Sequence, residues 1–394
     1  MGEEKRKTVG ILVAVYIASI AAGLIRPSLA LLMKLGLGAS VIAVSSMTSG
    51  FMAGRASLSL VAGLLGDLSP EKRRLFTLLP MLTAAVVVYA ATMLGSAYGI
   101  ILAMVFWGAM AGLTWPTAQT LITDVAKGRP GTVLSLYFAT GTLGVATGNF
   151  LFGVLPYSYR AIAEAGVLLL ALSSLLLWIS SAGIEVRVKR RMKLGEIKSR
   201  LDRRVMWILY SAFTAGFMTG LLREYFYVYV YQEYHLSKSN LGGLLATASL
   251  AALILGLAVG PLSDRVGIPK TLLATMGLGV IATFLLGLDH LYTITATGYI
   301  LALASGRAVL PLTRNAGLLG VGRGGSTMVG LANTVSNLGN MTSPLVAGAL
   351  YSSSIEIMGI TGDSLAYIIA CIMLLLSLIM YVAIFHVKRE TVNS

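Results

Sequence analysis

The chain has 394 residues, of which 56% are hydrophobic and only 12% charged, and its formal net charge is +14. So small a share of charged residues excludes a water-soluble globule, because too little polar surface remains to cover one. The basic residues fall mainly in short segments between long apolar runs, which favours a role in membrane orientation over nucleic-acid binding.

Twelve apolar runs follow one another along the chain, each about as long as a helix that crosses a hydrocarbon core of roughly 30 Å. They predict an all-α integral membrane protein with twelve transmembrane helices. A basic segment at 184–204 separates six runs from six, so we expect two six-helix bundles, 1–183 and 205–394, joined by a cytoplasmic linker. The predicted spans are 9–33, 40–65, 75–95, 98–122, 132–155, 161–183, 205–231, 240–263, 271–288, 292–318, 327–351 and 364–386.

The two halves of the chain carry related residues at a constant spacing. Asp67 and Asp264 lie 197 positions apart, and so do Arg26 and Arg223. A looser repeat, with a spacing of 195, relates residues 143–153 to residues 338–348. Coincident charges are informative in a chain with few of them, so the bundles are predicted to be pseudo-symmetric copies.

The distribution of Lys and Arg predicts which helix ends face the cytoplasm. With the N-terminus inside, almost all loop Lys and Arg fall on the cytoplasmic side, and only Lys34, Arg160 and Lys238 fall outside. Positive residues favour the cytoplasmic side of short loops. The first apolar run is too long for a signal-peptide core. We therefore expect a multi-pass protein of the cell membrane with cytoplasmic N- and C-termini.

Two charged, glycine-containing turns occupy equivalent places in the two halves. The second, G-P-L-S-D-R-V-G-I-P-K at 260–270, resembles the signature loop of the major facilitator superfamily of secondary transporters. The first, G-L-L-G-D-L-S-P-E-K-R-R at 63–74, departs from it at Leu68, where that family usually has arginine. A plain turn with orienting charges is the alternative. The resemblance implies cytoplasmic loops that latch the transporter closed, through Gly63, Asp67, Arg73, Gly260, Asp264, Arg265, Gly267 and Lys270.

Five arginines lie inside predicted spans, where a charged side chain costs at least about 2.5 kcal/mol unless it faces water or a partner. They are Arg26, Arg55, Arg223, Arg307 and Arg314. The family resemblance implies that the first, fourth, seventh and tenth spans line the substrate cavity, which places all of them except Arg55 beside it. Arg55 is predicted to make a contact between helices.

These positions yield the candidate substrate-binding or gate residues. Arg26 and Arg223 sit at equivalent depths, and two facing guanidinium groups would suit a carboxylate or phosphate. Alternatively, Glu224 pairs with Arg26 as an outer gate. Glu224 is also the carboxylate best placed within a cavity span to couple transport to protons. Arg307 and Arg314 are seven residues apart on one helix face, where they either line the cavity or pack helices together.

The excess of arginines over acids within the spans favours a secondary active transporter that moves a small organic anion by alternating access, coupled to protons or by exchange. The alternative is a multidrug/proton antiporter. Residues 143–153 faintly resemble the glycine-proline motif of such antiporters, but Asn149 stands where that motif needs proline. A polar set that would suit neutral solutes comprises Gln119, Tyr137, Asn333 and Asn337.

Other function classes find less support. No grouping of Ser, His and Asp, nucleotide-binding loop or cluster of metal ligands indicates an enzyme, a cofactor or a metal site. A single cysteine, Cys371, excludes an intramolecular disulfide. A non-transporting receptor is also less favoured. We expect a small-molecule substrate, membrane lipids and protons as partners, no nucleic acid, and a monomer.

Four tyrosines alternate near the predicted outer end of the seventh span, at Tyr225, Tyr227, Tyr229 and Tyr231. Tyrosine is enriched where membrane helices meet the headgroup region. Most of the four are therefore expected to anchor the helix at the interface, with one or two facing the mouth of the cavity.

Overall fold

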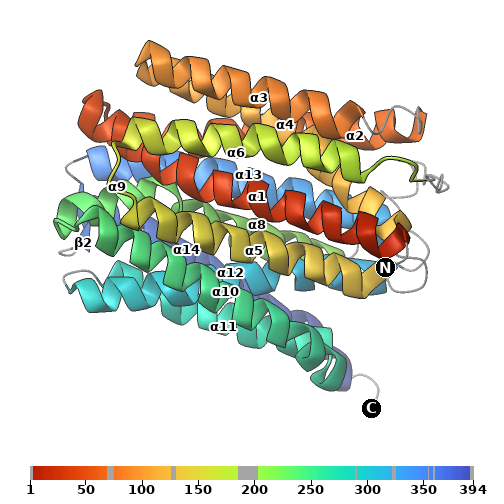
Figure 1. The fold of residues 1–394 in the computed structure, drawn as a ribbon. Helices are drawn as coiled ribbons and strands as arrows, with labels where there is room; N and C mark the ends of the chain where they lie inside the picture. The colour runs from red at the N-terminus through yellow and green to blue at the C-terminus, as the bar shows by residue number, and fades with distance from the viewer. Residues whose placement is uncertain are drawn as a thin grey trace. The chain divides into compact units, whose positions relative to one another are not determined.

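The computed structural model describes residues 3–68, 75–125, 130–184, 203–288, 291–321, 325–353, 355–357 and 360–390, and nearly all of them are helical (Figure 1). The first helices are α1 (Glu3–Leu31), the π-helical turn η1 (Leu32–Gly36), α2 (Val41–Leu68), α3 (Leu75–Leu94), α4 (Ala97–Val125), α5 (Pro130–Val154) and α6 (Tyr159–Ser180). The later ones are α8 (Arg203–Leu221), α9 (Glu224–Glu233), α10 (Lys238–Val266), α11 (Ile268–Gly287), α12 (Tyr292–Val321), α13 (Gly325–Ser352) and α14 (Gly362–Glu390). A short antiparallel hairpin, β1 (Glu356–Ile357) with β2 (Ile360–Thr361), precedes α14.

The order of the helices confirms the predicted all-α membrane architecture. Within the described ranges each predicted span coincides with one long helix, and α8 and α9, separated by a break at residues 222 and 223, together form the seventh. By length and composition, eight helices of the described part could each cross a membrane, or nine if α8 and α9 count as one span. The helices α2, α5 and α13, which are rich in Gly, Ser and Thr, fall outside this set.

The chain divides into two compact units. Unit 1 comprises Met1–Lys189 and Glu224–Leu253, and unit 2 comprises Arg190–Arg223 and Ile254–Ser394. Helix α9 and the first part of α10 therefore group with the first six helices, although they belong to the second half of the sequence. The domain boundaries expected from the sequence, with a linker at 184–204, remain a prediction.

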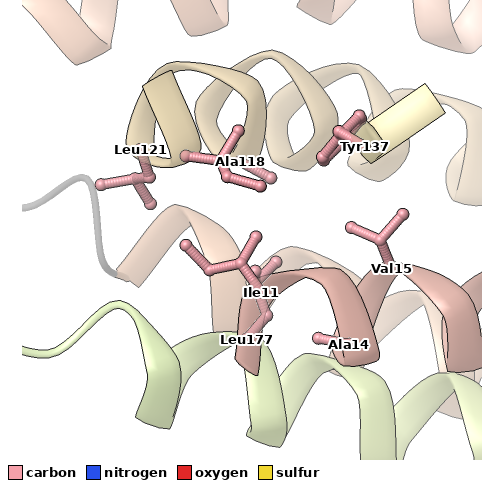
Figure 2. Packing of buried hydrophobic residues seen from close by; sticks show 8 residues of the cluster. Ile11, Ala14, Val15, Ala118, Leu121, Tyr137 and Leu177 are labelled. Atoms are coloured by element: carbon pink, nitrogen blue, oxygen red, sulfur yellow. The ribbon is translucent and has the colours of Figure 1, made fainter. Parts of the chain in front are cut away.

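In unit 1, α1 and α4 make most of the contacts between helices. Helix α1 packs against α5 and α6, α4 packs against α2 and α3, and α3 also meets α6. An apolar cluster joins four of these helices through Ile11, Ala14 and Val15 of α1, Ala118, Leu121 and Ile122 of α4, Tyr137 of α5 and Leu177 of α6 (Figure 2). Between membrane helices such a cluster contributes mainly through close van der Waals packing, because lipid is as apolar as the core.

Glycines allow α2 and α4 to approach backbone to backbone. Gly108 of α4 lies against the backbone of Phe51, and Gly112 lies against the backbone of Arg55. A Cβ at position 108 would lie 2.8 Å from the Cα of Phe51, which is too close for two carbon atoms. Small residues at a spacing of four are typical of closely packed membrane helices.

Gly108→Ala is expected to lower the free energy of unfolding by about 1–3 kcal/mol, because the new methyl group can be accommodated only by separating α2 from α4. The matched control is Gly277→Ala in α11, where an added Cβ meets no heavy atom within 4 Å among the described residues. Alanine at that position should stabilise the helix by up to about 1 kcal/mol. Thermal unfolding of both detergent-purified variants measures the difference, and equal effects would contradict the close packing of α2 on α4.

Unit 2 repeats the helix pairing of unit 1. Helix α8 packs against α13 as α1 packs against α5, and α11 packs against α12 and α14 as α3 packs against α4 and α6. Single contacts repeat as well. Gly144 lies against Tyr16, and Gly339, 195 positions later, lies against Phe213, which is 197 positions after Tyr16. The repeat in the sequence thus corresponds to the same helix contact in each unit, which confirms the pseudo-symmetric two-bundle fold.

Candidate functional site

Arg26 and Glu224 form a buried ion pair in unit 1. Arg26 lies near the C-terminal end of α1, and Glu224 is the first residue of α9. The guanidinium donates two hydrogen bonds to the carboxylate, from Nε to Oε1 and from Nη2 to Oε2, the second of them 3.0 Å long. The side chain of Glu224 is fully buried, and that of Arg26 is 12% exposed. A bidentate pair of this kind is among the strongest polar contacts in proteins.

Two further features stabilise the carboxylate of Glu224. The hydroxyl of Thr48 in α2 donates a hydrogen bond to Oε2 of the carboxylate. Glu224 also stands in the first turn of α9, where the free N–H groups and the helix dipole favour a negative charge. The carboxylate therefore ties three helices together, α1, α2 and α9.

Aromatic rings fix the plane of the Arg26 guanidinium. Its central carbon lies 5.0 Å from the centroid of the Phe51 ring in α2. The Phe51 ring meets Trp107 of α4 edge to face, with centroids 5.4 Å apart. A guanidinium above an aromatic face gains a cation–π attraction. The Phe51 ring, itself held by the edge-to-face contact with Trp107, thus helps to orient the guanidinium of the ion pair.

Arg223 lies in the break between α8 and α9, where the segment of unit 2 ends and that of unit 1 begins. At this break the carbonyl of Leu222 accepts a hydrogen bond of 3.4 Å from the hydroxyl of Tyr299 in α12. The sequence suggested either Arg223 or Glu224 as the residue facing Arg26, and the structure places Glu224 against it. A shared anion site of Arg26 and Arg223 remains a prediction.

Three more arginines occupy the membrane helices. Arg55 lies midway along α2 and is partly exposed, while Arg307 lies midway along α12 and is exposed. Arg314 is also on α12, but its side chain lies outside the described part of the structure.

A second set of contacts in unit 1 joins α5 to the first part of α10. The two backbones meet at Gly153 and Gly242, where a Cβ at Gly242 would lie only 2.4 Å from the Cα of Gly153. Asn149 donates through Nδ2 to the carbonyl of Leu245 at 3.4 Å and to the hydroxyl of Ser249 at 3.3 Å. The residue that departs from the antiporter motif is therefore a packing residue between α5 and α10.

Lys238 closes the same interface. Its Nζ donates to the carbonyls of Leu155 and Tyr157, just beyond the end of α5, the second at 3.1 Å. An ammonium group is unfavourable at the N-terminus of its own helix, α10, and favourable at the C-terminal end of α5. Contact with α5 thus accounts for a lysine at this position.

The turn at 260–270 has the predicted compact form. Gly267 lies between α10 and α11 with a φ of 89°, which side-chain-bearing residues rarely adopt, and Pro269 stands in the first turn of α11. Asp264, Arg265 and Lys270 are exposed, and within the described ranges none of the three forms an ion pair.

The first turn can be described only in part. Arg73 lies outside the described residues, and of Gly63 and Asp67 the structure describes only their place in α2. Gly260, the counterpart of Gly63, is exposed on α10. The role of both loops as cytoplasmic latches therefore remains a prediction.

Interfacial anchoring is the wrong expectation for two of the tyrosines in α9. Tyr225 and Tyr229 are fully buried, with rings stacked 6.2 Å apart. Tyr227 and Tyr231 are partly buried, and the hydroxyl of Tyr231 accepts a hydrogen bond of 3.4 Å from Tyr159. The physical reason is that α9 packs against α1 and α2, which makes one of its faces interior.

Comparison with known proteins shows which family and which solved structures this chain resembles. The sequence model of the Major Facilitator Superfamily matches residues 11–322 and 230–394. No curated protein matches the chain in sequence. Several solved structures share its fold. The nucleoside transporter NupG is 10% identical, with a TM-score of 0.74 over 96% of this chain and 99% of its own.

Two other solved structures are 14% identical to this chain. One is a bacterial homologue of the human lysosomal transporter Spinster, in an inward-facing and unoccupied conformation, with a TM-score of 0.69 over 97% of this chain and 96% of its own. The other is the human organic anion transporter MFSD10, with a TM-score of 0.66 over 97% and 100%. Likeness at this level of identity establishes the fold and leaves the substrate open.

The family match reaches from residue 11 to residue 394 in two overlapping segments, and the fold is that of solved membrane transporters. Both findings indicate a multi-pass transporter of small molecules rather than an enzyme. The repeated helix pairing of the two units and the glycine turn at residue 267 agree with them. The chain belongs to the major facilitator superfamily.

Proposed function

We propose that this protein is a secondary active transporter that moves a small organic anion across the membrane by alternating access, coupled to protons or by exchange. Membership of the superfamily supports transport of a small solute. The similar solved structures include both a nucleoside transporter and an organic anion transporter, so they leave the substrate class open. The class is argued from the arginines of this chain.

The observation that carries the anion class is the exposure of arginines at the middle of membrane helices. Arg55 in unit 1 and Arg307 in unit 2 each lie midway along a helix with an accessible side chain. Facing lipid, a guanidinium at that depth would cost at least about 2.5 kcal/mol, so we infer that the exposed part of each side chain faces water, whatever contacts its remaining atoms make. Positive charges along a water-filled path raise the local concentration of anions and repel cations.

The fully buried carboxylate of Glu224 does not offset those charges. Glu224 is engaged by Arg26 and Thr48, so its negative charge is already satisfied within unit 1. A drug antiporter would need an accessible acid to attract a cationic substrate. The geometry of Glu224 therefore supports an anion over a cation.

Glu224 also supplies a possible coupling step for the proposed cycle. Protonation of the carboxylate, or competition of a substrate anion for Arg26, would weaken the contact of α9 with α1 and α2. Either event favours opening at this end of unit 1. Arg26 and Glu224 then act as a gate, while Arg223, Arg307 and Arg314 are proposed to line the substrate path.

The cellular setting is part of the proposal. The distribution of basic residues supports a location in the cell membrane with cytoplasmic N- and C-termini and a cytoplasmic linker at 184–204. The ion pair of Arg26 then lies at the outer end of the helices, and the glycine turns lie at the cytoplasmic end. We propose a monomer that works among membrane lipids, with protons as the coupling ion unless transport proceeds by exchange.

Counterflow in proteoliposomes tests the function. Vesicles loaded with an unlabelled organic anion are expected to accumulate the same labelled anion, and Arg307→Gln should reduce the initial rate about tenfold to a hundredfold, the worth of a hydrogen bond to a charged group. Arg160→Gln, at an exposed arginine that pairs with Glu164, is the matched control and should leave the rate unchanged.

An imposed pH gradient separates proton coupling from exchange. Counterflow of lipophilic cations with none of anions would contradict the proposal.

A further inference from the structure

Three asparagines of α13, in unit 2, differ in how their amides are bonded. Asn340 is 4% exposed, and its Nδ2 donates to the carbonyl of Ser336 at 3.1 Å while its Oδ1 accepts from the hydroxyl of Thr219 in α8 at 3.2 Å. Asn333 and Asn337 are partly exposed, and neither of their amides forms a hydrogen bond with a residue that the structure describes. Asn340 therefore joins α13 to α8, whereas the other two amides keep their full capacity for hydrogen bonds.

Both free amides lie well inside the helix. Helix α13 begins at Gly325, and a rise of about 1.5 Å per residue places Asn333 about 12 Å and Asn337 about 18 Å along it. Lipid offers an amide no hydrogen-bond partner, so an amide at that depth is expected to face protein or water. Since no described residue is that partner, we infer that water or a solute takes its place.

The direction of the two amides supports this inference. Asn333 and Asn337 are four residues apart and therefore share one face of α13. The exposed apolar residues Leu338 and Leu345 lie on another face, rotated from the first by roughly 80° to 140° at 3.6 residues per turn. Helix α8 packs against a third face, at Gly339. The leucines are thus the lipid-facing residues, and the asparagine face is left for the water-filled path of the transporter.

The chemistry of the two amides selects the group that they bind. Each amide donates through Nδ2 and accepts through Oδ1, and neither carries a charge. The Oδ1 of Asn333 is buried without a donor among the described residues, and a half-turn of the amide would exchange its oxygen and nitrogen. A hydroxyl group also donates one hydrogen bond and accepts others, so it matches a pair of amides. We propose that Asn333 and Asn337 form a subsite in unit 2 that binds a hydroxyl group of the transported anion.

This subsite rests on the proposed transport of an organic anion and concerns the uncharged part of that solute. In the sequence the same two amides suited a neutral solute as an alternative to an anion, whereas here a single solute carries both groups. A site built to hydrogen-bond a hydroxyl discriminates against the analogue that lacks it, because the polar groups of the site are then left unpaired. The expected substrates are therefore hydroxylated organic acids.

Cysteine labelling tests, without any substrate, whether the asparagine face is open to water. The variants Asn333→Cys, Asn337→Cys and Leu345→Cys are made in a Cys371→Ala background and reconstituted in lipid vesicles, with a charged thiol reagent on both sides of the membrane. Only a thiolate reacts, so a cysteine in contact with water should be labelled and one in contact with lipid should not. We expect labelling at positions 333 and 337 and none at 345. The reverse pattern would overturn the proposal.

Binding of matched anions to the full-length, detergent-purified protein tests the hydroxyl. The probes are pairs of acids that differ by one hydroxyl, namely propionate with lactate, succinate with malate and benzoate with 4-hydroxybenzoate, and Kd is read from the rise in unfolding temperature. The hydroxylated member is expected to bind more tightly. Asn337→Leu should weaken its binding about fivefold and leave the unsubstituted acid unchanged. Thr342→Val is the matched control and should keep the preference, because the Thr342 hydroxyl is satisfied by the Leu338 carbonyl of its own helix.

The outcomes separate failure of the subsite from failure of the proposed function. If the wild type binds both members of each pair equally, the subsite is wrong and anion transport stands. The same holds if the preference survives in the double variant Asn333→Leu with Asn337→Leu. If lipophilic cations stabilise the wild type and no anion does, the proposed function fails and the subsite fails with it. Should the leucine variants not fold, Asn337→Ala and the labelling pattern decide the question.

Discussion

Glu224→Ala is expected to lower the free energy of unfolding by about 3–5 kcal/mol. The substitution removes the bidentate partner of Arg26 and leaves a guanidinium that is only 12% exposed without its counter-ion. Removing one member of a buried ion pair costs this much because the remaining charge has lost both water and partner. The loss also frees the start of α9 from α1 and α2. Denaturation of the purified protein in detergent, near neutral pH, measures the effect.

Two further variants make this expectation specific. Glu233→Ala removes an exposed carboxylate at the other end of α9 and should change stability by less than about 0.5 kcal/mol. The double variant Arg26→Leu with Glu224→Leu should recover most of the loss, because replacing both members of a buried pair by apolar residues is often neutral. Equal stability of Glu224→Ala and Glu233→Ala would show that the buried pair contributes nothing.

A disulfide between α5 and α10 is expected to abolish transport. Asn149 and Ser249 are hydrogen-bonded side chain to side chain at 3.3 Å, so Asn149→Cys with Ser249→Cys should form the bond in a Cys371→Ala background. Under the proposed alternating access, the contact between α5 and α10 has to separate once in each cycle. Oxidised vesicles should therefore show no counterflow, and reductant should restore it.

The single-cysteine variants serve as controls for this cross-link. Each alone, in the same Cys371→Ala background, should transport equally before and after oxidation. Full counterflow in the quantitatively cross-linked protein would mean that α5 and α10 stay together throughout the cycle. The gate would then have to be sought elsewhere in the chain.

The sequence sufficed to predict the helices and the family, because both follow from patterns that extend over many residues. Apolar length predicts the spans, and the spacings of 197 and 195 survive because duplicated helices make the same contacts, as Gly144 with Tyr16 and Gly339 with Phe213 do. A single charge in an apolar run is also conspicuous. For that reason Arg26 and Glu224 could be proposed as partners before any geometry was known.

The remaining parts of the site depend on packing that no periodicity reveals. Thr48 and Phe51 are ordinary residues of an apolar helix, and only the placement of α2 beside α1 and α9 brings them to the ion pair. Tyr225 and Tyr229 are of a residue type that is enriched at the membrane–water interface. They are nevertheless buried, because α9 belongs to unit 1. From the sequence, Lys238 was expected to be a basic residue of an outer loop. Its contacts with the end of α5 depend on the placement of α10 beside α5.

The most direct test of anion transport is ligand-induced stabilisation of the purified protein across organic anions, their neutral parents and lipophilic cations, with Arg307→Gln in parallel. A ligand at about a hundred times its Kd adds about 2.7 kcal/mol to the free energy of unfolding. We expect one or more anions to raise the unfolding temperature of the wild type, neutral parents to have no effect, and Arg307→Gln to lose most of the response. Stabilisation by cations, undiminished in Arg307→Gln, would contradict the anion class and favour a multidrug antiporter.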